Sequence, residues 1–175
     1  MDIRYLKGVG EKRAAQLARL GIRTVDDLLG FYPRDYVDYS HPYPVAGAPY
    51  DVKCVVRATV YGKNGGARIR GGRQMAKATA GDDTASLILT YFNNPYALQK
   101  LEVGREYLFF GKVGGTFTAR EMVNPVMLTV ESAAASPLVP VYPQTEGVSS
   151  AYLAKCVRAA FASAPDIEEP LPAAL

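Results

Sequence analysis

The middle of this chain has a hydrophobic period of two, which restricts it to a sheet with one buried face. Between Val52 and about Val130, apolar residues recur at every second position, and Cys54, Val56 and Ala58 begin the pattern. Successive side chains of a strand point to opposite faces, so a period of two predicts strands, whereas helices repeat every 3.6 residues. We therefore expect a mainly β domain at residues 52–130, with helices outside it.

Turn-forming residues divide this region into five strands and one short helix. Asn64-Gly65-Gly66 predicts a hairpin turn, Gly71-Gly72 a bend, Asn93-Asn94-Pro95 a break and Gly114-Gly115 a second hairpin turn. Three strands, a short helix and two further strands make up the element order of the five-stranded Greek-key barrel called the OB-fold, whose ligands commonly bind on strands 2 and 3. The expected strands are 52–58, 67–80, 84–92, 106–113 and 116–123, with the helix at 96–101.

The residues before the barrel predict a small helical hairpin and a connector. In residues 1–33, a helix is expected from Glu11 to Leu20 and ends at Gly21, a residue suited to the left-handed conformation of a helix C-terminus. Thr24 is a good N-cap for a second helix. Residues 34–51 are rich in proline and tyrosine and show neither helical nor alternating periodicity, so we expect an extended connector held by its aromatic side chains.

Residues 131–175 predict an extended segment followed by a final helix. Small residues follow the barrel, and residues 137–148 are expected to be extended. The helix is expected from Ala151 to about Ala162, with Ser149 or Ser150 as its N-cap. The last residues show no folded ending, so we expect this chain to be the leading part of a longer protein.

The distribution of charge is more informative than its total. The 175 residues are 49% apolar, enough for a sizeable core, and the net charge is only +3. Residues 52–81 nevertheless contain no acidic residue, while five acidic and two basic residues lie in 131–175. The basic stretch is either a solvated hairpin face or a surface for a polyanion such as a phosphate backbone. Its basic residues are Lys53, Arg57, Lys63, Arg68, Arg70, Arg73 and Lys77.

The sequence gives little support for catalysis. It contains no phosphate-binding GxxxxGK[ST] loop, and its only histidine, His41, has no cysteine partner at metal-ligand spacing. Cys54 and Cys156 lie far apart and are expected to be small apolar core residues. We expect no catalytic activity, cofactor or metal. No apolar run has the length of a membrane span and no secretory signal begins the chain, so a cytoplasmic protein is expected.

Two motifs are candidates for nucleic-acid contact. Leu6-Lys7-Gly8-Val9-Gly10 resembles the glycine turn of helix–hairpin–helix motifs, in which backbone N–H groups approach a DNA phosphate. Phe92 and Tyr96 flank the predicted break after the third strand, where exposed aromatic rings could stack on bases. For each motif a purely structural role, as a helical hairpin or as packing over the barrel end, remains the alternative.

Longer stretches resemble one family. LKGVGEKRAAQLARLGIRTVDDLLGFYPRDYVD, LILTYFNN, VYPQTEGVSSAYL and LPAAL occur in the order found in RecG-type ATP-dependent branched-DNA helicases. The resemblance implies a wedge domain with an OB-fold that meets the branch point of stalled forks and Holliday junctions. The motor domains, which use ATP and Mg²⁺, would follow in the parent protein. The implied partners are branched DNA, these motor domains in cis and, as a candidate, single-stranded DNA-binding protein, all in the bacterial cytoplasm.

The resemblance also implies roles for individual residues. Phe92 and Tyr96 would stack on unpaired bases at the branch point. The alternative is an OB-fold module that binds RNA or protein without junction specificity. The residues implied to contact phosphates are Arg57, Lys63, Arg68, Arg70, Arg73 and Lys77 and, in the glycine turn, Gly8 and Gly10.

Overall fold

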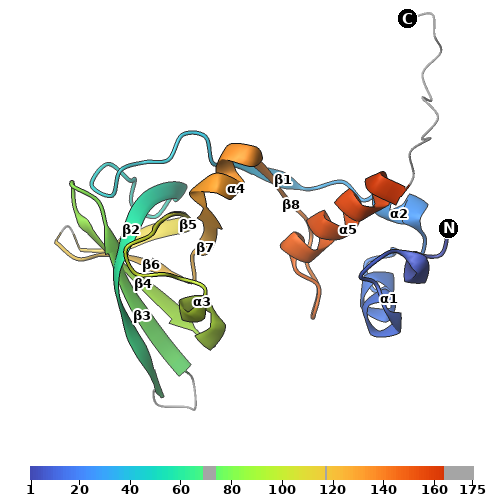
Figure 1. Ribbon diagram of the computed structural model, residues 1–175, viewed down its shortest axis with the longest axis horizontal. Helices are drawn as coiled ribbons and strands as arrows, with labels where there is room; N and C mark the ends of the chain where they lie inside the picture. Colours follow the sequence, from blue (N-terminus) through green and yellow to red (C-terminus); the bar gives the residue numbers. More distant parts are fainter. Residues whose placement is uncertain (69–73, 117, 164–175) are drawn as a thin grey trace, which may run out of the picture. The chain divides into compact units, whose positions relative to one another are not determined.

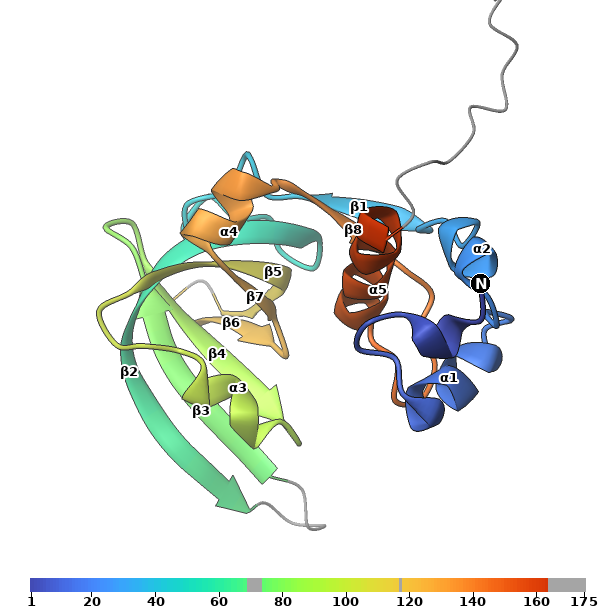
Figure 2. The same ribbon diagram turned by 45° about the vertical axis from the view of Figure 1, so that its right-hand side comes forward.

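The computed structural model describes residues 1–68, 74–116 and 118–163, which form two compact units (Figures 1 and 2). The barrel unit is Asp38–Val139, and the terminal unit combines Met1–Val37 with the described part of Pro140–Leu175. The chain thus passes from one unit to the other twice. The two passing segments, β1 (Asp35–Asp38) and β8 (Leu138–Val141), form a two-stranded sheet.

The barrel unit is a closed five-stranded barrel with one added strand. The sheet order is β2-β3-β4-β6-β5-β7, and β2 also pairs with β5, which closes the barrel. β4 and β6 are parallel, and the other pairs are antiparallel. The mainly β OB-fold predicted from the element order is confirmed. The elements are β2 (Lys53–Arg68), β3 (Gln74–Gly81), β4 (Ser86–Phe92), α3 (Pro95–Gln99), β5 (Glu106–Gly115), β6 (Arg120–Val123), β7 (Val126–Thr129) and α4 (Val130–Ala135).

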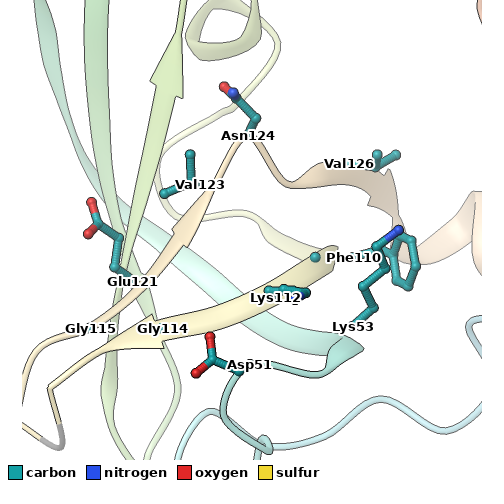
Figure 3. A pocket seen from close by; sticks show the side chains of 11 residues that line it. Asp51, Lys53, Phe110, Lys112, Gly114, Gly115, Glu121, Val123, Asn124 and Val126 are labelled. Atoms are coloured by element: carbon teal, nitrogen blue, oxygen red, sulfur yellow. The ribbon is translucent and has the colours of Figure 1, made fainter.

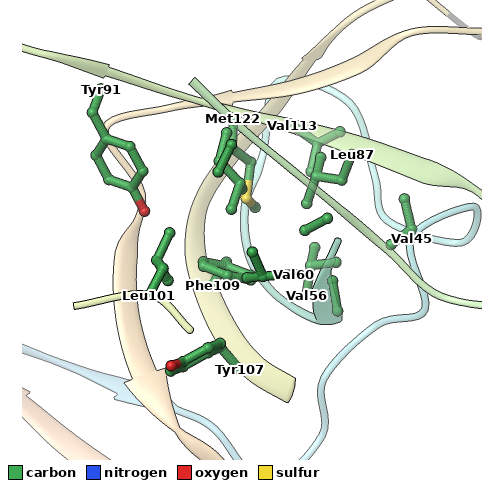
Figure 4. Close-up of a cluster of buried hydrophobic side chains, with 14 of the residues drawn as sticks. Val45, Val56, Val60, Leu87, Tyr91, Leu101, Tyr107, Phe109, Val113 and Met122 are labelled. Atoms are coloured by element: carbon green, nitrogen blue, oxygen red, sulfur yellow. The ribbon is translucent and has the colours of Figure 1, made fainter. Parts of the chain in front are cut away.

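The apolar residues that recur at every second position fill the barrel interior. Val56 and Val60 from β2, Leu87 from β4, Phe109 from β5 and Met122 from β6 are fully buried and meet inside the barrel (Figure 4). Burial of a side chain of this size stabilises a fold by about 1.5–3 kcal/mol. Cys54 belongs to the same core, as expected, and burial raises the pKa of its thiol.

The hairpin predicted at Asn64–Gly66 is wrong, because β2 continues through these residues. Asn64 lies opposite Lys77 and Ala67 lies opposite Met75, so β2 has one residue more than β3 between these pairs. This is a β-bulge, which places an extra residue in one strand and increases its twist. A second one-residue shift lies nearer the start of β2. The two glycines therefore belong to a bent strand and not to a turn.

Other boundaries also differ from the predictions. The second barrel strand begins at Gln74 instead of residue 67, and the bend predicted at Gly71-Gly72 lies outside the described residues. β5 runs through Gly115, which pairs with Arg120, so the turn of this hairpin falls after the two glycines. Gly115 has a φ of +85°, and a Cβ there would collide with the backbone of the turn. Glycine therefore ends the strand here.

The small residues after the barrel, for which no helix or strand was predicted, form helix α4. The Thr129 hydroxyl accepts a hydrogen bond from the backbone N–H of Ser132 (3.2 Å) and so caps the helix. Three alanines in succession, which have the highest helix propensity, then continue it.

The terminal unit is built from both ends of the chain. Leu17 and Leu28 from the N-terminal segment share one core with Val148 and Leu153 from the C-terminal segment. Cys156 belongs to this core, as expected, and burial raises the pKa of its thiol. The elements are η1 (Ile3–Tyr5), α1 (Glu11–Ala18), α2 (Val25–Leu29) and α5 (Ser150–Ser163).

The helix caps of the terminal unit follow the sequence prediction closely. Gly21 has a φ of +81°, just beyond the end of α1. The Thr24 hydroxyl accepts from the backbone N–H of Asp27 (3.1 Å), whose carboxylate in turn accepts from the N–H of Thr24. Of the two candidate caps of α5, Ser149 accepts from the N–H of Tyr152 (3.3 Å), whereas the Ser150 hydroxyl donates to the carbonyl of Pro140.

The proline- and tyrosine-rich connector is fastened to the barrel by a buried arginine. Arg120 of β6 is only 5% exposed, and its guanidinium donates to the carbonyls of Ala46 (2.7 Å) and Ala48 (2.9 Å). The same group lies 4.7 Å from the centre of the Tyr50 ring.

The domain boundaries predicted at residues 33, 51 and 130 stay predictions. Within the described residues, no helix is long and apolar enough to cross a membrane.

Replacing Arg120 with methionine should destabilise the barrel unit by at least about 2 kcal/mol, because the carbonyls of Ala46 and Ala48 would lose their donors in a poorly solvated place. Urea unfolding followed by circular dichroism measures this loss. Arg120→Lys, which keeps the charge and some of the donors, should lose less. Equal losses in the two variants would contradict the role of the two carbonyl contacts.

Candidate nucleic-acid interface

The two aromatic residues singled out in the sequence lie on either side of one turn at the end of β4. Phe92 is the last residue of β4 and is half-buried, whereas Tyr96 lies in the first turn of α3 and is 67% exposed. Tyr96 also lines a cleft of about 290 Å³. That cleft is lined by Tyr91, Asn94, Tyr96, Ala97, Lys100, Asn124, Pro125, Val126 and Met127. The exposed ring of Tyr96 thus lies beside a cleft whose lining includes a positively charged side chain, that of Lys100.

Two asparagines with left-handed backbone fix this end of the strand. Asn93 has a φ of +54°; its N–H donates to the Gln74 carbonyl (2.8 Å), and its side-chain oxygen accepts from the Gln74 N–H (3.2 Å). Asn124 has a φ of +47°, and its side-chain oxygen accepts from the Phe92 N–H (2.8 Å). Asparagine tolerates this conformation better than most residues. The two amides thus continue the β ladder on both sides of Phe92 where the regular strands end.

Lys63 has a structural role that the sequence did not indicate. Its ammonium donates to the carbonyls of Leu98 (3.2 Å) and Leu101 (2.6 Å), at the end of α3 and just after it. The last carbonyls of a helix lack partners within the helix and attract cations. An ammonium has three donors, and Lys63 uses two of them to hold the helix that carries Tyr96.

The other predicted phosphate contacts lie on different seams of the barrel. Arg57 is exposed on the half of β2 that pairs with β5, opposite Leu108. Lys77 lies on β3 opposite Thr90 of β4, and its ammonium is 3.8 Å from a carboxylate oxygen of Glu121, which also accepts from the Thr90 hydroxyl. The described structure therefore does not bring Arg57 and Lys77 to the same strand pair.

The side chains of three residues predicted to contact phosphates lie outside the described part of the structure. Arg68 is the last residue of β2, and only its backbone belongs to the description. Arg70 and Arg73 lie outside the described residues.

The glycine turn lies in the terminal unit, between η1 and α1. Gly8 has a φ of +90°, and a Cβ added at Gly8 or Gly10 would meet nothing within 4 Å. The Tyr152 hydroxyl of α5 donates to the Gly8 carbonyl (3.1 Å), and the Arg13 guanidinium lies 4.7 Å from the centre of the Tyr152 ring. The turn is thus braced by the C-terminal helix and leaves open space at both glycines.

Sequence reasoning missed Lys100 and Asn124, both of which line the Tyr96 cleft. Lys100 follows α3 as an isolated cation, so no local pattern indicates it. Asn124 precedes Pro125, which is a turn signal. However, its contact with Phe92 joins residues 32 positions apart, and only the folded barrel brings them together.

Comparisons with known proteins agree on one family. The RecG wedge domain model matches residues 2–164. The chain is 34% identical to the ATP-dependent DNA helicase RecG of Escherichia coli K12 over 86% of this chain and 22% of that protein, and 31% identical to that of Thermotoga maritima over 88% and 20%. A solved structure of RecG bound to a three-way DNA junction superimposes with a TM-score of 0.83 at 27% identity, over 99% of this chain and 24% of that one. The chain spans about a fifth of the length of these curated relatives.

Asn124→Ala should destabilise the barrel by about 1–3 kcal/mol, because alanine is strained at a φ of +47° and leaves the Phe92 N–H without its acceptor. Asn124→Gly should relieve the backbone strain but not restore the acceptor for the Phe92 N–H. Asn124→Asp should keep the acceptor and also tolerate the left-handed backbone. Amide hydrogen exchange at Phe92 separates the two effects. It should be faster in the alanine and glycine variants than in the aspartate variant, and equal rates in all three would contradict the proposed contact.

Lys63→Met should loosen α3 and lower stability by about 1–2 kcal/mol, since two hydrogen bonds from a charged donor are lost. Lys77→Met removes an equal charge but only a partly exposed ion pair, so it should cost at most about 1 kcal/mol. Amide exchange across residues 96–101 and urea unfolding measure the difference. If the two variants behave alike, Lys63 does not hold the helix.

Proposed function

This chain belongs to the RecG wedge domain family, and from that premise we propose that it is the branched-DNA-binding wedge module of a longer RecG-type helicase. The observation that carries the proposal is the match of 99% of the chain to RecG bound to a three-way DNA junction. The exposed Tyr96 and half-buried Phe92 at one end of an OB-fold supply an independent reason, because aromatic side chains are the usual base-stacking groups of this fold.

In this proposal the barrel acts passively. The duplex is pulled against the end of β4, and Phe92 and Tyr96 stack on the bases that lose their partners at the branch point. Stacking of one base on an aromatic side chain contributes about 1–3 kcal/mol, which offsets part of the cost of unpairing. The hydrogen bonds of Asn93 and Asn124 to the strand ends, and those of Lys63 to α3, hold both rings in place before DNA arrives.

The separated strands would be held through their phosphates. Arg57 lies on the β2–β5 seam and Lys77 on the β3–β4 pair, so the two cations can serve different parts of the branched DNA. Phosphate contacts position DNA without reading its sequence, which suits a protein that recognises shape. Lys63, Arg68, Arg70, Arg73, Gly8 and Gly10 remain proposed phosphate contacts on the grounds of sequence resemblance.

The motor activity would lie elsewhere in the parent protein. Domains that use ATP and Mg²⁺ would pull the DNA, and the wedge would split parental from nascent strands during fork regression in DNA recombination and repair. Single-stranded DNA-binding protein is a candidate partner of the parent. We expect no ATP hydrolysis by this chain alone.

Phe92→Ala should weaken binding to a three-way junction by about tenfold, within the range expected for one stacked base. Fluorescence anisotropy with labelled junction, duplex and single-stranded DNA, at several salt concentrations, measures the effect. Tyr32→Ala is the matched control, because Tyr32 is 79% exposed but belongs to the terminal unit, and it should leave the affinity unchanged.

Two results would reject the proposal. One is equal, weak binding of the unmodified chain to all three DNA shapes with no loss in Phe92→Ala. The other is displacement of the junction by a structured RNA at equal concentration, which would favour an OB-fold module for RNA.

A further inference from the structure

A groove on the barrel has no role in the function proposed so far. It is a cleft of about 510 Å³, formed along β5, β6 and the start of β7 (Figure 3). Asn124 and Val126 line both this groove and the Tyr96 cleft, so the two are adjacent. The groove is lined by Asp51, Lys53, Phe110, Gly111, Lys112, Gly114, Gly115, Glu121, Val123, Asn124 and Val126.

Two cations face each other at one end of this groove. Lys53 of β2 and Lys112 of β5 are directly opposite in the antiparallel ladder, and both are exposed. Directly opposed side chains of a ladder have Cβ atoms about 4.5–5.5 Å apart, and like charges in this position destabilise the pair. An anion between the two ammonium groups would remove that cost. Lys100 supplies a third cation in the Tyr96 cleft.

The rest of the lining suits a nucleotide chain. Gly114 offers backbone without a side chain, and a Cβ there would meet nothing within 4 Å. Val123 and Val126 are more than half exposed, which leaves apolar surface for the flat face of a base or sugar. Cations for the backbone together with apolar and aromatic surface for bases are the features of grooves that bind single strands.

The groove also contains two carboxylates, and they are not equivalent. Glu121 is 3.8 Å from the Lys77 ammonium and accepts a hydrogen bond from Thr90, so part of its charge is balanced by these neighbours. Asp51, which precedes β2 with a φ of +56°, lies on the same wall as the two lysines and would repel a phosphate. Removal of the Asp51 charge should therefore strengthen the binding of a phosphate in the groove.

We propose that this groove holds a single-stranded DNA arm next to the branch point, with a phosphate between Lys53 and Lys112 and another at Lys100 in the adjacent Tyr96 cleft. The arm would reach the groove from Tyr96, where the proposed base stacking takes place, because the two clefts share the wall formed by Asn124 and Val126. This inference rests on the proposed function. It adds a path for a DNA strand that includes none of the predicted phosphate contacts. An acidic peptide is the competing occupant. The position of the groove next to the Tyr96 cleft and the apolar surface at Val123 and Val126 favour DNA.

The test compares Lys53→Gln/Lys112→Gln with Asp51→Asn in the full 175-residue chain. The probes are a fork with two single-stranded arms and a three-way junction without unpaired arms, and anisotropy is read over a salt series. The lysine double variant should bind the fork about fivefold more weakly, and its slope of log affinity against log salt should fall by about 0.7, the value for one lost phosphate contact on a single strand. Asp51→Asn should bind the fork more tightly, by about twofold. Neither change should alter binding to the fully paired junction.

Lys155→Gln/Arg158→Gln is the matched control, since it removes the same charge from exposed positions of α5 and should leave both slopes unchanged. The inference is overturned if the groove variants bind the fork like the unmodified chain while Phe92→Ala still loses affinity. It is also overturned if the lysine double variant loses affinity for a poly-glutamate peptide but not for the fork. Failure of the proposed function would look different, because the unmodified chain would then not distinguish the fork or the junction from duplex DNA.

Discussion

The barrel depends on a single strand that pairs on both sides. β2 pairs with β5 over its first half and with β3 over its second half, and these two sets of hydrogen bonds close the sheet. A sheet can close only if its strands twist and tilt, and the two bulges of β2 provide additional twist. Among the described residues of the basic stretch, Lys53 and Arg57 therefore lie on the part of β2 that pairs with β5, and Lys63 lies on the part that pairs with β3.

Several polar residues stabilise the fold at the positions where the chain leaves regular structure. Arg120 fastens the connector through the carbonyls of Ala46 and Ala48, and Lys63 holds the end of α3 in the same way. Asn124 replaces a missing strand partner for Phe92. Each of these side chains satisfies buried or half-buried backbone groups that would otherwise cost about 1–3 kcal/mol apiece. Lys63 in this way holds the helix that carries Tyr96.

Features that depend on contacts between near neighbours in the sequence were predicted more accurately than features that depend on contacts between distant residues. The cap at Thr24 and the left-handed Gly21 depend on neighbours within a few residues, and they were predicted correctly. The cap of the last helix is Ser149, one of the two residues predicted for it. The hairpin at Asn64–Gly66 was wrong because a glycine pair has the same local signature in a turn and in a bulge. Only the register with β3 distinguishes the two, and that register depends on residues far along the chain.

By itself, the sequence determined that this chain forms an OB-fold between helical segments, because hydrophobic period and turn residues are local and act in order along the chain. It also drew attention to Phe92 and Tyr96, and the family resemblance to RecG extended over nearly all of it. The tertiary structure alone decided that the two chain ends share one core, that Lys63 contacts backbone carbonyls, and that Lys53 and Lys112 face each other beside a groove. These features join residues that are distant in sequence. They are fixed by strand register and packing, which no local pattern of residues specifies.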